Sequence, residues 1–72
     1  MPKLYELPRD KGIRIKAETT NGEGKKIGDF IIFHHLDGMY SYCTVEETGD
    51  VVHLSASQEL KLNKKGNYYV LK

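Results

Sequence analysis

Apolar and polar residues alternate along most of this chain with a period of two, which is typical of strands that have one solvated face. The alternation is clearest over Ile13–Glu18, where apolar and charged side chains take turns. No segment sustains a helical period, so we expect short strands throughout. The predicted strands are Ile13–Glu18, Phe30–Leu36, Met39–Glu46 and Val51–Leu54, followed by a last hairpin, or a strand plus tail, over Leu60–Leu71.

Turn residues separate these strands. Thr19–Gly28 contains three glycines and predicts a flexible loop or a loose hairpin tip. Asp37-Gly38 is typical of a two-residue hairpin turn. A second turn is expected over Glu47–Asp50, and Ser55–Leu60 favours one short 3₁₀ turn. The pattern therefore predicts an all-β, small five-stranded SH3-like barrel with an antiparallel central meander, as one domain over residues 1–72 with an extended lead-in over 1–11.

The two central hairpins predict which residues share a face. If Asp37-Gly38 forms the first turn, Leu36 lies opposite Met39, and a turn centred on Thr48-Gly49 sets the next pairing in agreement. One face is then aliphatic and forms the core, with Phe30, Ile32, Cys43, Val45, Val52 and Leu54. The outer face is aromatic and half polar, with Ile31, Phe33, His35, Tyr40, Tyr42, Thr44 and His53.

The aromatic outer face is the candidate binding surface, because tyrosine and histidine combine an apolar body with a polar tip. Its expected members are Phe33, His35, Tyr40, Tyr42 and His53. The alternative is structural: the N-terminal residues Leu4, Tyr5 and Leu7, or the C-terminal segment Tyr68–Leu71, fold across this face as a second layer. The sequence leaves both open.

Composition excludes several classes of protein. A chain of 72 residues with net charge +1 and 29% charged residues is an ordinary globular domain near the lower size limit for a self-sufficient core. It has no apolar run of membrane-spanning length and no signal-peptide pattern, so we expect a cytoplasmic location, the host cytoplasm if the protein is phage-encoded. Its single cysteine rules out an internal disulfide.

Three histidines and one cysteine raise the question of metal or thiol chemistry. His34 and His35 are neighbours on a strand and point to opposite faces unless a bulge intervenes. His34 is expected opposite Ser41 near the hairpin end, which predicts a rim residue. Cys43 belongs to the core face, where a thiol acts as a small hydrophobe. Zinc requires four convergent ligands, which this spacing does not supply. We therefore expect no metal, no cofactor and no catalytic residue, and hence no enzyme.

Nucleic acid is the alternative ligand. Phe33, Tyr40 and Tyr42 could stack on bases, and the expected phosphate contacts are Arg14, Lys16, Lys25 and Lys26. Charge argues against it, because residues 29–60, which hold the aromatic block, carry six carboxylates and no lysine or arginine. The basic residues lie in the two end segments, which a barrel brings together because its first and last strands are neighbours.

The run from Tyr40 to Val51, followed by Glu59-Leu60 and Tyr69–Leu71, resembles the YorP family of small SPβ-prophage proteins. The resemblance covers the C-terminal half and does not include the Thr19–Gly28 loop. It implies an SH3-like barrel and a phage or prophage origin, and it implies no catalytic residue. The leading function hypothesis is a non-enzymatic interaction module that binds a protein partner or a second copy of itself through the aromatic outer face. RNA or single-stranded DNA binding through the loop lysines and tyrosines is the alternative.

Overall fold

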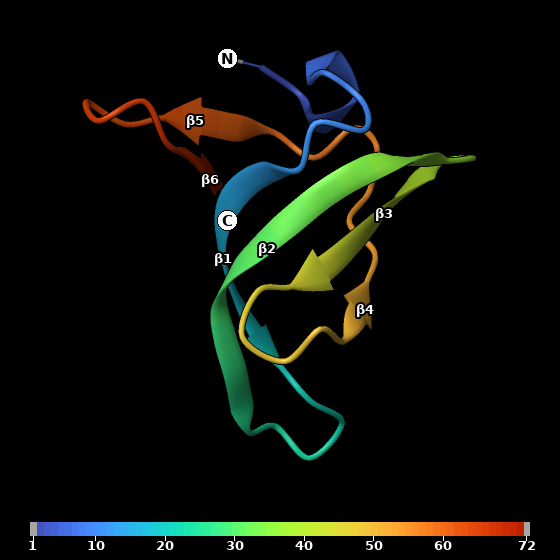
Figure 1. The fold of residues 1–72 in the computed structure, drawn as a ribbon, viewed down its shortest axis with the longest axis vertical. Coiled ribbons are helices and arrows are strands. Elements are labelled where there is room, and N and C mark those ends of the chain that lie inside the picture. Colours follow the sequence, from blue (N-terminus) through green and yellow to red (C-terminus); the bar gives the residue numbers. More distant parts are fainter. Residues whose placement is uncertain (1, 72) are drawn as a thin grey trace.

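The computed structural model describes residues 2–71 and shows one curled sheet, preceded by a short 3₁₀ turn (Figure 1). The predicted all-β class is confirmed, with six strands where five were expected. The additional strand arises because residues 60–70 form a true hairpin. The elements are η1 (Leu4–Glu6), β1 (Ile13–Thr20), β2 (Lys26–Asp37), β3 (Tyr40–Val45), β4 (Val51–Val52), β5 (Leu60–Leu62) and β6 (Tyr68–Val70).

The strands follow the order β4-β3-β2-β1-β6-β5, with β2, β3 and β4 forming the predicted antiparallel meander. All neighbours are antiparallel except β1 and β6, which run parallel (Figure 1). The first and last strands are therefore adjacent, as expected. The prediction of a closed barrel was wrong, because the two outermost strands, β4 and β5, do not pair with each other and the sheet remains open.

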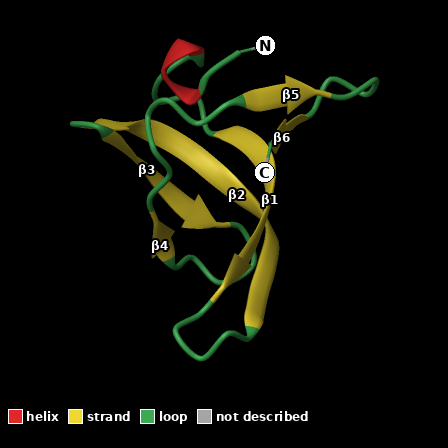
Figure 2. Ribbon diagram, turned by 180° about the vertical axis from the view of Figure 1, so that it is seen from behind, coloured by secondary structure: helices red, strands yellow, loops and turns green. Residues whose placement is uncertain are grey.

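The core lies inside the curl of the sheet, and the N-terminal segment completes it. Leu4 and Leu7 are buried there, so the described part of the predicted lead-in, residues 2–11, contributes to the core. Within the described residues, the 3₁₀ turn lies at Leu4–Glu6 and not in the predicted Ser55–Leu60 segment (Figure 2). The Glu6 carboxylate accepts the Lys3 N–H at 2.6 Å, which fixes this turn. The fully or nearly buried apolar residues are Leu4, Leu7, Ile15, Ile31, Phe33, Cys43, Val45 and Leu60.

A bulge in β2 overturns the predicted faces of that strand. The turn residues are Gly38-Met39, so Asp37 pairs with Tyr40, two positions from the predicted register. Phe33 then pairs with Cys43 while His35 pairs with Tyr42, which leaves His34 as one extra residue. The extra residue reverses the alternation. Ile31 and Phe33 therefore point into the core, and Phe30 and Ile32 are only partly buried.

The pairing of β3 with β4 also differs from the prediction, but by an even number of residues. Cys43 pairs with Val52, where Leu54 was expected. Because a shift of two residues preserves the faces, Val52 and Leu54 pack against the core as predicted and His53 is exposed.

The first hairpin loop is shorter than the predicted Thr19–Gly28, since β1 continues to Thr20 and β2 begins at Lys26. The Asn21 side chain accepts the N–H groups of Glu23 and Lys25 at 2.9 and 3.0 Å, which closes this tip.

Candidate functional site

Tyr42 lies at the centre of the aromatic outer face. The His35 ring stacks on it with centroids 5.2 Å apart and planes 3° from parallel, and the His34 ring is tilted against it at 5.4 Å. Both histidines reach one tyrosine because the bulge turns His34 to the same face as its neighbour. The prediction that His34 and His35 point to opposite faces was therefore wrong, because it assumed a strand without a bulge. The Nε2 of His34 lies 2.9 Å from the Thr44 hydroxyl, which fixes the ring.

His53 and Tyr40 extend this face toward the β2–β3 turn. The Nδ1 of His53 lies 2.8 Å from the Ser41 carbonyl, so Nδ1 carries a proton and donates it to that oxygen. Tyr40, His53 and Asp37 line a shallow hollow of about 280 Å³. Tyr40 is 58% exposed and the neighbouring Met39 is 82% exposed. We use the name aromatic face for His34, His35, Tyr40, Tyr42 and His53.

Phe33 does not belong to the aromatic face. Its side chain is fully buried in the core, because the bulge places it on the same side as Cys43. The predicted binding role of Phe33 is therefore corrected to a structural one. The other four predicted residues, His35, Tyr40, Tyr42 and His53, lie on the outer face or its rim.

The two terminal segments do not form a second layer over the aromatic face. Leu4 and Leu7 belong to the buried core cluster, and Tyr68 and Val70 pack against that same cluster. These segments therefore cover the inner side of the sheet. Within residues 2–71, the alternative prediction that a terminal segment folds across the aromatic face is therefore contradicted.

The four predicted phosphate contacts do not form one groove. The Arg14 guanidinium makes a two-pronged ion pair with Glu46, with N–O distances of 2.7 and 2.8 Å, and lies 3.6 Å from the centroid of the Phe30 ring. Lys26 pairs with Asp29. The guanidinium hydrogen bond lowers the pKa of Glu46, and the same bond raises the pKa of Arg14. Lys25 lies at the first hairpin tip, and Lys16 lines a separate cleft.

Cys43 is buried, and burial raises the pKa of its thiol. The Ser41 hydroxyl lies 3.3 Å from its sulfur. Among residues 2–71, no group of three or more histidine, cysteine or carboxylate side chains lies close enough to hold a metal ion. In the same range, no helix has the length and apolarity needed to cross a membrane.

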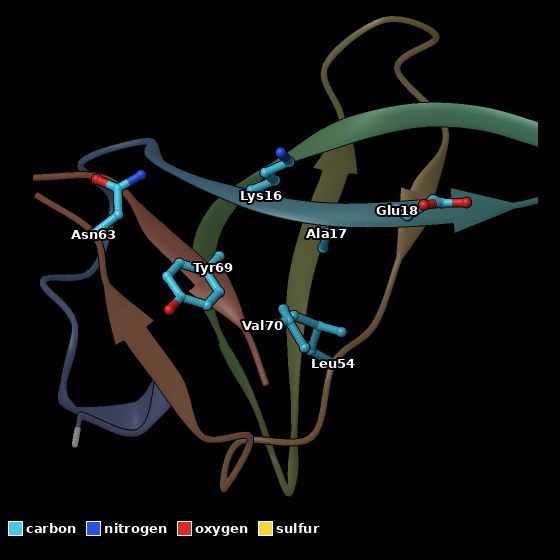
Figure 3. A pocket seen from close by; sticks show the side chains of 7 residues that line it. All are labelled: Lys16, Ala17, Glu18, Leu54, Asn63, Tyr69 and Val70. Carbon is cyan, nitrogen blue, oxygen red and sulfur yellow. The ribbon is translucent and has the colours of Figure 1, made fainter. Parts of the chain in front are cut away.

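The sequence analysis missed a second concave region, which lies beside β1 and β6. It is a cleft of about 520 Å³ bordered by β1, β6 and the chain after β4 (Figure 3). No local motif indicates it, because it depends on the pairing of β1 with β6. Its lining residues are Lys16, Ala17, Glu18, Leu54, Asn63, Tyr69 and Val70.

Comparison with known proteins gives no relative: no family model, no curated protein and no solved structure matches this chain. The resemblance to the YorP family therefore stays a prediction.

Proposed function

We propose that this protein is a non-enzymatic interaction module that binds a protein partner, or a second copy of itself, through the aromatic face. The observation that supports this best is an outward-facing cluster of one tyrosine and two histidines that neither terminal segment covers. The predicted resemblance to YorP supports a role as a phage or prophage accessory protein. The proposal assigns no catalytic residue and no cofactor.

The chemistry of the aromatic face suits a protein interface. Tyrosine is enriched at such interfaces because it buries a large area with few rotatable bonds and can still donate a hydrogen bond from its hydroxyl. The His35–Tyr42 stack is already ordered, so little side-chain freedom is lost on binding. Met39 and Val51, which are 82% and 50% exposed, add apolar area beside it. Polar tips and apolar bodies are thus present on one ordered surface.

Nucleic acid is less well supported as the ligand of the aromatic face. Arg14 and Lys26 are paired with carboxylates, and a phosphate would have to compete with those partners. Titration with a labelled single-stranded oligonucleotide at low and moderate salt tests this alternative. We expect no binding that weakens with salt, whereas a salt slope sensitive to Tyr42→Ala would support nucleic-acid binding instead.

The proposal is tested with Tyr42→Ala and, as a matched control, Tyr5→Ala, which removes a half-exposed tyrosine outside the aromatic face. Light scattering over a concentration series first shows whether the protein associates with itself. If it is monomeric, partners captured by cross-linking are purified and their affinity is measured by calorimetry. We expect Tyr42→Ala to weaken association about tenfold, or about 1.4 kcal/mol, with little change in the thermal midpoint.

Two results would contradict the proposal. In the first, Tyr42→Ala lowers the thermal midpoint strongly, which would make Tyr42 a structural residue. In the second, the Tyr5 and Tyr42 variants weaken association equally, which would place the interface elsewhere.

A further inference from the structure

One edge of β1 lacks a strand partner over its second half. β1 extends to Thr20, but β6 pairs with it only at Ile15 and Lys16. Beyond Val70 the chain turns toward β5, since the Leu71 N–H donates to the Glu59 carbonyl at 3.2 Å. Within residues 2–71, no strand therefore pairs with residues 17–20 on the side away from β2. Unpaired backbone N–H and C=O groups at such an edge favour the addition of another strand.

The open cleft lies beside this edge and provides space for side chains. Ala17 borders it from β1, and Leu54 and Val70 contribute apolar surface from the chain after β4 and from β6 (Figure 3). All three side chains are partly buried. A volume of about 520 Å³ is within the range of sites that bind small ligands, so it can hold a side chain of a partner.

Two lysines flank Tyr69, and one of them, Lys16, lines the cleft. Lys16 of β1 and Lys61 of β5 both lie in register with Tyr69, one on each side of it. Neither lysine forms an ion pair within the described residues, unlike Arg14 and Lys26. Among the described residues that line the cleft, Glu18 is the one with a carboxylate. An occupant with carboxylates near Lys16 and Lys61 therefore complements these two lysines.

We propose that the cleft and the unpaired edge of β1 bind an extended, acidic segment of a partner protein, which adds as a strand beside residues 17–20 of β1. Its backbone pairs with the free edge, an apolar side chain enters the cleft between Leu54 and Val70, and a carboxylate faces Lys16. An extended peptide satisfies all three features, because its side chains alternate in direction while its backbone bonds to β1. This site is separate from the aromatic face and does not depend on it.

The probe is a blocked octapeptide of alternating valine and aspartate, added to ¹⁵N-labelled protein and followed by amide chemical shifts. We expect shifts at residues 17–20 and at Leu54, with the aromatic face unchanged. Lys16→Glu should weaken binding about fivefold, since exposed ion pairs contribute little each. Lys25→Glu makes the same charge change at the first hairpin tip and should leave the affinity unchanged.

Two altered peptides test the backbone and charge requirements without changing the protein. Methylation of alternate amide nitrogens removes strand donors and should weaken binding about tenfold. Replacement of aspartate by lysine should abolish binding. The proposal is overturned if the peptide shifts only the aromatic face, if methylation has no effect, or if millimolar peptide causes no shifts. It is equally overturned if the amide chemical shifts of residues 17–20 change with protein concentration alone, because a second copy would then be the occupant. Tighter binding of an oligonucleotide than of the peptide at residues 17–20 would also overturn it.

Discussion

Gly28→Ala tests how tightly β2 packs against β3. Gly28 is buried, and a Cβ at this position would lie 2.5 Å from Cγ1 of Val45 and 3.1 Å from Oε2 of Glu47. Carbon atoms in contact prefer about 3.5–4.0 Å, so Val45 would have to move by about 1 Å. Val45 is 1% exposed and β-branched, which leaves it little room to rotate. Overpacking of this kind costs about 1–3 kcal/mol.

That loss is large for a chain of 72 residues, whose total free energy of unfolding is about 4–11 kcal/mol. Urea unfolding measures it directly, and each kcal/mol should lower the thermal midpoint by about 4–8 °C. Gly22→Ala is the control, because a Cβ at Gly22 meets no atom within 4 Å. Val45→Ala should also cost less in the Gly28→Ala background than alone, since the smaller side chain relieves the clash. A Gly28→Ala variant within about 0.5 kcal/mol of the parent, or strictly additive substitutions, would refute the packing at this site.

Three further predictions follow from burial and charge. Phe33→Ala should cost about 3–5 kcal/mol in urea unfolding, because Phe33 is fully buried, and Ile32→Ala should cost much less; the reverse order would place the bulge elsewhere. Cys43 is buried, so it should react with a thiol reagent only as fast as the protein unfolds, and rapid labelling of folded protein would contradict its burial. Burial also raises the pKa of the Cys43 thiol, so the free energy of unfolding should fall as the pH rises above 9.0, the usual pKa of that thiol. Arg14 lowers the pKa of Glu46 below its usual 4.5, so the Arg14–Glu46 pair stabilises the fold above pH 4.5. This contribution is lost as the pH falls through the lowered pKa of Glu46. Glu46→Gln should therefore reduce the loss of stability at acid pH, and an unchanged acid dependence would count against the pair.

The sequence predicted strands where local signals are strong and failed where pairing is non-local. Alternation placed the start of β1 correctly at Ile13, two residues of its end were missed, and turn residues placed the antiparallel meander. The predicted faces of β2 were wrong for the residues before His34, because the bulge at His34 was not foreseen. Two consecutive histidines give no compositional sign of a bulge. Phe33 was consequently assigned to the surface when it is fully buried.

The candidate sites were predictable to different degrees. Tyr40 and Tyr42 lie on β3 and His53 directly follows β4, and the predicted registers there were wrong by two residues, which leaves the faces unchanged. The cleft and the unpaired edge of β1 were not predictable, because they depend on where β6 stops pairing with β1. The sequence indicated only that basic end segments would meet, and Lys16 and Lys61 on either side of one tyrosine are the result.

The parallel pairing of β1 with β6 has a consequence for how the protein folds during synthesis. β1 lies next to the centre of the sheet order, yet one of its partners is Tyr68–Val70, more than 45 residues later in the chain. The β2–β3–β4 meander can form as soon as it leaves the ribosome, whereas β1 keeps one edge unpaired until residues 68–70 have also emerged. Loop closure over such a distance is slow compared with hairpin formation. The nascent chain therefore passes through a stage in which the whole edge of β1 is open to other strands, and that stage is where aggregation would begin.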